Sequence, residues 1–344
     1  MKVKFATLIV CALSCGAALV SEPASADAVG DFYRGKQITF IVATGSGGGY
    51  DAYGRLLTRH YKNHIPGQPN FVVQNMPGAG GIRATTFIYN TAPKDGTVMA
   101  IVHSGMTTLS LLEPENANFD ATKLTWLGNI EEETSLCVSW HDSPIKTTQD
   151  MMTKEFIVGG TGSGANLEVY PRVMNKILGT RIKVISGYKG GNDVNLAIER
   201  GELQGRCSWP MSSIHSTRPQ WLPEKKLNFL VQTGMEKDPE LPDVPLILEL
   251  VKNSDDRAVM ELIFAPRSLL RPVVGPPDMP ADRTAALRSA FMKTLADKAF
   301  LDDAAKQQLT VTPKSGEVMQ NLIHKIHQAP KAVVERAKQA MSPD

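Results

Sequence analysis

Two glycine-rich loops constrain the fold of this chain more than any other feature. The first, Ala43-Thr44-Gly45-Ser46-Gly47-Gly48-Gly49-Tyr50-Asp51, follows the apolar run 38–42, and the second, Gly159-Gly160-Thr161-Gly162-Ser163-Gly164-Ala165-Asn166, follows the apolar run 156–158. Each loop ends where a helical pattern begins, and a helix start leaves about four backbone N–H groups unpaired and carries a partial positive charge. Because glycine lets this backbone approach a ligand closely, each loop is a candidate anion site. Two such loops could hold one small acidic molecule from opposite sides.

The first residues are typical of a secretory signal. A short basic segment precedes an apolar stretch, and Ala24-Ser25-Ala26 fits the small-x-small cleavage pattern. We therefore expect residues 1–26 to be removed and the mature protein to begin at Asp27 in the periplasm. Lipid attachment at Cys15 is the alternative, because the residues before it weakly resemble a lipoprotein signal. No later stretch approaches the roughly 18 apolar residues of a membrane-spanning helix, so we expect the mature protein to be soluble.

Charge and cysteine content exclude several classes of function. The chain has 37 basic and 35 acidic residues, a balance that gives no electrostatic reason to expect nucleic acid or an anionic membrane as partner. Cys137 and Cys207 are the two cysteines outside the expected signal peptide. They either form a disulfide in an oxidising compartment or stay as two buried thiols. Without a Cys-x-x-Cys pair or a completed histidine set, we expect no metal site.

Short β-branched runs alternate with amphipathic stretches along the whole chain, which predicts parallel α/β sheets. The expected strands are 38–42, 70–74, 98–102, 156–158, 183–186 and 229–232. The expected helices are 52–62, 81–90, 167–178, 193–200, 283–296 and 318–328.

Each glycine loop belongs to its own α/β unit, so we expect two lobes. Lobe 1 is predicted to comprise 27–129 plus 232–344, and lobe 2 to comprise 130–231. The chain would then cross between the lobes twice, through a hinge of two crossing segments. Because ligands of open α/β sheets bind beyond the C-terminal ends of the strands, facing lobes would bring both sets of loops into one cleft.

Five segments, in order, resemble one family of proteins: the periplasmic substrate-binding receptors of tripartite tricarboxylate transporters, also called Bug-type receptors. Besides the first glycine loop, they are Asn75-Met76-Pro77-Gly78-Ala79-Gly80-Gly81, Ala92-Pro93-Lys94-Asp95-Gly96-Thr97, Tyr188-Lys189-Gly190-Gly191 and Pro242-Asp243-Val244-Pro245. The first loop departs from the family, which carries prolines and an aromatic residue where this chain has Ala43 to Ser46.

The resemblance implies a two-lobed periplasmic-binding-protein fold of the Venus-flytrap, type II-like kind. It also implies a small carboxylate-bearing ligand held between the lobes, no catalytic activity and no cofactor. The ligand would be delivered to separate transporter membrane subunits, and we expect the receptor to be a monomer. The ligand itself stays open among aliphatic diacids, tricarboxylates, aromatic acids and amino acids.

The candidate ligand-binding residues come from the two loops and from nearby strand ends. They are Thr44, Gly45, Ser46, Gly47, Gly48, Gly49, Tyr50, His103, Ser104, Thr161, Gly162, Ser163, Gly164, Ala165, Asn166, Tyr188 and Ser208. Asp51 is interpreted as a helix-start residue, because a carboxylate would repel an acidic ligand. Arg206 could pair a second carboxylate, although an arginine on a solvated face is the commoner case.

Three other functions fit single features of the sequence. Gly160 to Ala165 match the dinucleotide fingerprint G-x-G-x-x-A, but no acidic residue follows the next expected strand. A hydrolase could use the same cleft, but no nucleophile elbow or H-E-x-x-H motif is present. A ligand sensor that docks on a signalling protein is not distinguished from a transport receptor by sequence.

Overall fold

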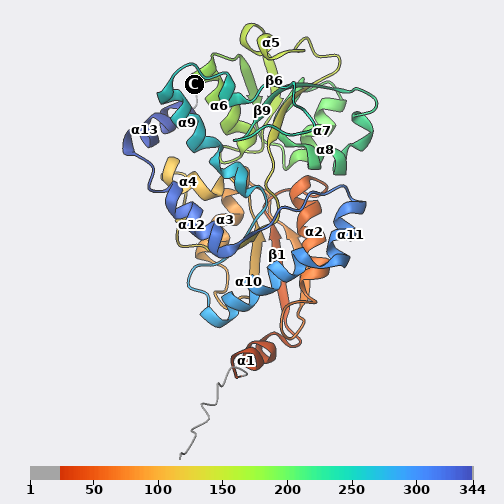
Figure 1. The fold of residues 1–344 in the computed structure, drawn as a ribbon, viewed down its shortest axis with the longest axis vertical. Coiled ribbons are helices and arrows are strands. Elements are labelled where there is room, and N and C mark those ends of the chain that lie inside the picture. Colours follow the sequence, from red (N-terminus) through yellow and green to blue (C-terminus); the bar gives the residue numbers. More distant parts are fainter. Residues whose placement is uncertain (1–23, 343–344) are drawn as a thin grey trace, which may run out of the picture.

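The structure is a computed structural model that describes residues 24–342 of the 344-residue chain. It has two lobes, each built on one β-sheet with helices packed against it (Figure 1). The prediction of a two-lobed α/β fold is confirmed. The expected signal peptide lies outside the described residues, except for 24–26 at the start of helix α1.

Lobe 1 contains a six-stranded sheet. In spatial order its strands are β11 (Lys314–Ser315), β4 (Thr125–Asn129), β10 (Pro272–Gly275), β3 (Val98–Ile101), β1 (Gln37–Val42) and β2 (Asn70–Asn75). Strand β1 pairs in parallel with β2 and β3, whereas β10 is antiparallel to β3 and β4, and β11 is antiparallel to β4.

Lobe 2 contains a five-stranded sheet. In spatial order its strands are β7 (Ile182–Ile185), β6 (Phe156–Gly159), β8 (Gly205–Pro210), β5 (Ser135–Trp140) and β9 (Leu227–Thr233). Strand β6 is parallel to β7 and β8, whereas β5 is antiparallel to β8 and β9. Both sheets are therefore mixed, whereas parallel sheets were expected. Strand β5 enters lobe 2 directly from β4, and β10 re-enters lobe 1 from lobe 2. Each of these two strands is therefore antiparallel to the βαβ strand beside it.

Helices cover both faces of each sheet (Figure 1). Around the first sheet they are α1 (Ala24–Tyr33), α2 (Gly49–Tyr61), α3 (Ile82–Asn90), α4 (Met106–Leu112), α10 (Ala281–Ala296), α11 (Lys298–Lys306) and α12 (Gly316–Ile326), with the 3-10 turn η1 (Ala79–Gly81). Around the second sheet they are α5 (Thr148–Thr153), α6 (Asn166–Leu178), α7 (Gly191–Glu199), α8 (Met211–Thr217), α9 (Ser254–Phe264) and α13 (Lys331–Met341), with the turns η2 (Pro219–Trp221) and η3 (Ile247–Glu249).

The apolar pattern of β1 explains why its sheet is buried on both faces. Phe40 and Val42 pack on the core beneath α2 and α10, whereas Ile41 packs on the opposite core beneath α3 and α12. Successive side chains of a strand point to opposite faces, so a continuous apolar run is what a sheet between two helical layers requires. This burial fixes the end of β1, and with it the start of the first glycine loop.

The chain passes between the lobes three times. The segment 130–134 joins β4 to β5, the residues after η4 (Ala265–Leu269) lead into β10, and 327–330 joins α12 to α13. The third passage was not predicted from the sequence. Helices α9 and α13 contact each other and share a core with β6, although both lie within 232–344, which was expected to belong to lobe 1. The predicted lobe boundaries stay a prediction.

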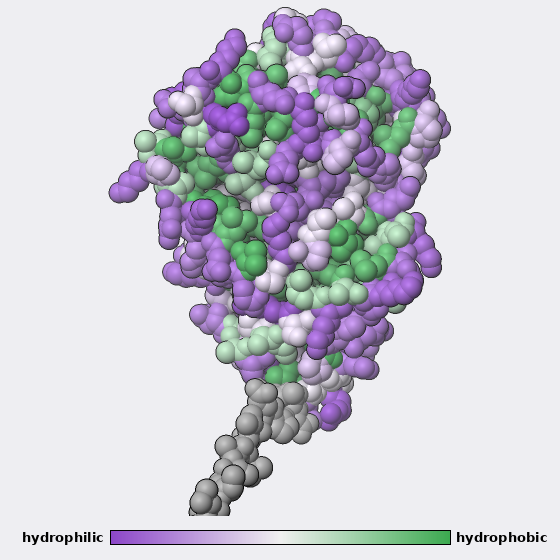
Figure 2. Space-filling view, viewed as in Figure 1, coloured by the Kyte–Doolittle hydropathy of each residue, from purple (hydrophilic) through white to green (hydrophobic). Residues whose placement is uncertain are grey.

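Polar residues cover most of the face shown in Figure 2, and apolar residues gather there in several separate patches. The large exposed apolar side chains are spread over both lobes, with Val72 on β2, Ile185 on β7 and Leu301 on α11 among them. Within residues 24–342, none of the helices has the length and apolar character needed to cross a bilayer.

Candidate functional site

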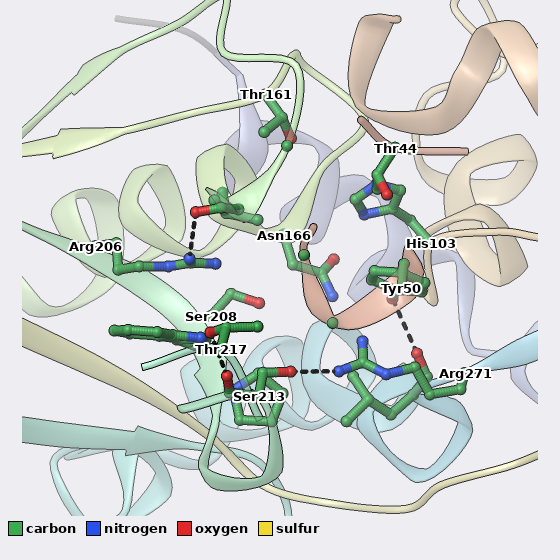
Figure 3. Close-up of a pocket in the computed structure, with 18 of the residues that line it drawn as sticks. Thr44, Tyr50, His103, Thr161, Asn166, Arg206, Ser208, Ser213, Thr217 and Arg271 are labelled. Carbon is green, nitrogen blue, oxygen red and sulfur yellow. Dashed lines mark hydrogen bonds between the residues drawn. The ribbon is translucent and has the colours of Figure 1, made fainter. Parts of the chain in front are cut away.

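A small cavity lies between the lobes, at the strand ends where the loops of both sheets meet (Figure 3). Its volume is about 50 Å³. The cavity is therefore small. Its lining comprises Thr44, Gly48, Gly49, Tyr50, His103, Thr161, Asn166, Leu167, Gly190, Gly191, Asn195, Arg206, Ser208, Trp209, Pro210, Ser213, Thr217, Arg267, Leu270 and Arg271.

The structure brings some of the sequence-predicted site residues to this cavity and leaves others outside its lining. Those that line it are Thr44, Gly48, Gly49, Tyr50, His103, Thr161, Asn166 and Ser208. Those outside the lining are Gly45, Ser46, Gly47, Ser104, Gly162, Ser163, Gly164, Ala165 and Tyr188. That any of them binds a ligand stays a prediction.

Arg206 on β8 is a buried charge in the cavity wall whose hydrogen-bond partners are neutral. Its side chain is 4% exposed and lies 4.6 Å over the Trp209 ring. One guanidinium nitrogen donates to the Gly191 carbonyl at 3.0 Å and to Asn195 Oδ1 at 2.8 Å, and its Nε is buried without a hydrogen-bond partner. Burial, helped by Arg218 and Arg271, lowers the pKa of Arg206, but a guanidinium stays protonated at neutral pH. Arg206 is therefore a buried cation held by neutral groups, contrary to the solvated role considered more common.

Arg271 lies at the hinge and contacts both lobes. Its Nε is 3.1 Å from Glu131 Oε2, and both side chains are buried. One terminal nitrogen donates to Ser213 Oγ on α8 at 2.7 Å, and the guanidinium lies 4.4 Å over the Tyr50 ring of α2. Figure 3 shows Arg271 between Ser213 and Tyr50. This arginine connects the hinge to the cavity wall.

Two further titratable groups determine the charge at the site. Burial and the nearby Glu131 carboxylate raise the pKa of Glu133 well above its usual range. Burial, with Arg271 adding to it, lowers the pKa of His103 to about 4, so its imidazole is neutral. His103 lies against the Tyr50 ring, 4.7 Å between centroids. The positive charge at the cavity is therefore that of its arginines.

The contacts of Asp51 confirm its interpretation as a helix-start residue. One oxygen, Oδ2, accepts from the Gly47 N–H at 2.9 Å and from Arg55 Nε at 3.0 Å, and Oδ1 accepts from Asn75 Nδ2 at 2.9 Å. These hydrogen bonds lower the pKa of Asp51 against the effect of its partial burial. The carboxylate stabilises the first glycine loop and lies outside the cavity lining.

Several polar lining residues were missed from the sequence. Ser213 and Thr217 lie on α8, the helix that directly follows β8, so the rule that strand ends carry ligand groups could have found them. Arg271 interrupts the apolar run Leu269-Leu270-Arg271-Pro272-Val273-Val274. A lone charge in such a run is a signal for a paired buried ion. Nothing in the local sequence distinguishes Asn195 or Arg267 from ordinary surface residues.

A disulfide joins Cys137 on β5 to Cys207 on β8, which settles the open question about these residues. The two strands are antiparallel neighbours, and their register shifts at this point. Cys207 lies between Arg206 and Ser208, both of which line the cavity. The bond therefore fixes the strand segment that carries them. Among the described residues, no cluster of histidine, cysteine and carboxylate side chains suits a metal ion.

Comparison with known proteins adds to this geometry. The sequence model of the family described as "Tripartite tricarboxylate transporter family receptor" matches residues 57–338. A protein of Cupriavidus necator, named "UPF0065 protein in gbd 5'region", is 28% identical over 251 residues, which are 70% of this chain and 72% of that protein.

Two solved structures have the same fold. The periplasmic binding protein BugD is similar with a TM-score of 0.71 at 18% identity, over 90% of this chain and 98% of its own. MatC from Rhodopseudomonas palustris, solved with bound malate, gives a TM-score of 0.68 at 19% identity, over 89% of this chain and 99% of its own.

Proposed function

The chain belongs to the tripartite tricarboxylate transporter receptor family, and we propose that it holds a small dicarboxylate between its two lobes and presents it to the membrane subunits of such a transporter. Members of this family are solute-binding receptors and not enzymes, and their location is the periplasm. MatC, which shares the fold, was solved with the dicarboxylate malate.

The observation that carries the proposal is an excess of buried arginine at the cavity. Arg206, Arg267 and Arg271 all line it and are all buried. Of the acidic groups beside them, Glu131 pairs with Arg271, whereas burial and the neighbouring Glu131 raise the pKa of Glu133 and so disfavour its charged form. Buried charges are costly unless they are paired, so the positive excess favours a ligand with two negative charges.

The same lining argues against the other ligand classes. Within the described chain it contains no aspartate or glutamate, so the ammonium group of an amino acid would have no carboxylate partner. The small cavity volume, about 50 Å³, argues against a large ligand. Thr161 Oγ1 is buried there without a hydrogen-bond partner and could donate to a carboxylate or to a hydroxyl group.

A thermal-shift screen tests this proposal. We expect succinate and L-malate to raise the melting temperature, because a ligand that binds only the folded state stabilises it. Succinamate, which replaces one carboxylate with an amide, and L-aspartate, which adds an ammonium group, should give smaller shifts at equal concentration. Incubated acids should be recovered unchanged. The proposal fails if no dicarboxylate shifts the transition, or if aspartate matches succinate.

Export and assembly complete the proposed function. Residues 1–26 would be the cleaved signal, and the mature receptor would act as a monomer, since the two lobes of one chain enclose the cavity. The intact mass of the exported protein under native conditions measures both properties. A lipid adduct at Cys15 or a dimer mass would contradict them.

A further inference from the structure

We propose that the segment 79–81 of lobe 1 and the loop 161–165 of lobe 2 form a closure clasp, in which main-chain atoms of the two lobes bind each other directly rather than through the ligand. This goes beyond the proposed function, because neither its evidence nor its test depends on what the ligand is. Gly78 to Gly81 belong to a motif that has no place in the cavity lining. In the loop 161–165, only Thr161 lines the cavity.

The contacts across the clasp are made by main-chain atoms. The Gly80 N–H donates to the Thr161 carbonyl at 2.9 Å. A Cβ atom added to Gly80 would lie 2.8 Å from the Gly164 carbonyl carbon and closer still to the Ala165 nitrogen. One added to Gly162 would lie 2.6 Å from the Ala79 carbonyl carbon. Glycine is needed at both positions because the other lobe occupies the space of a side chain.

Neighbouring contacts extend the same surface. Gly105, at the start of α4, would place a Cβ atom 2.9 Å from Asn166 Oδ1 and 3.1 Å from the Gly164 carbonyl. Asn166 Nδ2 donates to Ser104 Oγ at 3.0 Å. Residues that the sequence assigned to ligand contact thus hold the lobes together on one side of the cavity.

A second contact between the lobes lies in the other pair of loops. The Gly45 N–H donates to the Lys189 carbonyl at 2.8 Å. A Cβ atom on Gly45 would lie 3.2 Å from Lys189 Cβ. An ordinary disulfide has Cβ atoms about 3.5–4.5 Å apart, so this pair is slightly too close. If the two loops separate by a few tenths of an ångström, cysteines at these positions can trap the closed state.

The clasp would act on affinity through closure. The apparent affinity of a receptor is its intrinsic affinity reduced by the fraction of molecules in the binding-competent state. Blocking the clasp should therefore weaken binding of any ligand and also slow closure when no ligand is present. Thr161 and Asn166 both line the cavity and contact lobe 1, so they would couple the two events.

Trapping of the ligand-free protein tests the clasp. Gly45→Cys and Lys189→Cys are combined, and the rate of disulfide formation is measured in three backgrounds: no further change, Gly80→Ala and Gly179→Ala. Gly80 and Gly179 have similar left-handed backbones, with φ of 65° and 73°, but nothing lies within 4 Å of a Cβ atom on Gly179. The two substitutions therefore carry similar backbone strain, and only Gly80→Ala meets the other lobe.

We expect trapping to be about tenfold slower with Gly80→Ala than with Gly179→Ala. Gly105→Ala provides a variant without left-handed strain, since its φ is −57°, and it should slow trapping in the same direction. Equal rates in the Gly80→Ala and Gly179→Ala backgrounds would overturn the clasp, as would failure of the cysteine pair to cross-link in every background. No ligand is added in the trapping experiment, so its result does not depend on the dicarboxylate proposal. If only that proposal is wrong, trapping shows the expected difference between variants while dicarboxylates give no thermal shift.

Discussion

Replacing Arg206 with glutamine is expected to weaken binding of a small dicarboxylate by at least about 30-fold, because losing one partner of a buried charge pair costs roughly 2–5 kcal/mol. Arg206 is buried, and its hydrogen bonds in the protein go to a carbonyl and an amide rather than to a carboxylate. Within the described chain the hydrogen bonds of Arg206 go only to neutral groups. The ligand would therefore supply its negatively charged partner. Isothermal titration with succinate or L-malate measures the loss.

Two variants control this experiment. Arg200→Gln removes an arginine from the surface of the same lobe, where its side chain is 68% exposed and lies 3.9 Å from Glu202, and it should leave the affinity unchanged. Arg206→Lys keeps the charge but loses the planar fork that matches a carboxylate, so its affinity should lie between those of the wild type and Arg206→Gln. Unchanged affinity in Arg206→Gln would exclude the arginine from the binding site.

Loss of the disulfide between Cys137 and Cys207 is expected to lower the free energy of unfolding by about 4 kcal/mol in the chain-entropy model, because the bond closes a loop across a sequence separation of 70 residues. Chemical denaturation of the oxidised and the reduced wild type measures this difference. Both cysteines are fully buried, so the protein should be unfolded in reductant and then refolded in it.

The double variant Cys137→Ala, Cys207→Ala separates the bond from the reductant. Its stability should be low and the same with and without reductant, whereas the wild type should respond strongly. Since Cys207 lies between two cavity residues, we also expect weaker dicarboxylate binding in the reduced protein. Equal stability of the oxidised and reduced wild type would contradict the prediction.

The elements that could be predicted are those with strong periodicity. All six expected strands and all six expected helices are present, with ends that differ by a few residues. Short or polar elements such as α8 and β10 were missed, because they contain too few residues to show a period. Strand direction was missed for another reason: apolar patterning buries a strand but does not say which way the chain enters the sheet.

The cavity residues that follow a strand could be predicted from the sequence, whereas those contributed by distant segments of the chain could not. The strand-to-helix loops placed Thr44, Tyr50 and Thr161 at the cavity, because strand ends face the space between lobes. A glycine indicates that another group approaches the backbone closely but does not identify that group. Gly162 was expected to face a ligand, and it contacts Ala79 of the other lobe. Arg271 reaches the cavity from a third part of the chain. The apolar run around it signals a paired buried ion but does not identify the residues that it meets.

The third passage of the chain, at 327–330, has a mechanical consequence. Two adjacent hinge segments alone would allow the lobes both to bend and to twist relative to each other. Helix α13 packs against α6 and α9 of lobe 2 and also contacts α4 of lobe 1. It therefore forms a further connection between the lobes besides those two segments. A third connection would restrict twisting and leave a single hinge-bending motion. The two lobes would then return to the same relative orientation each time they close.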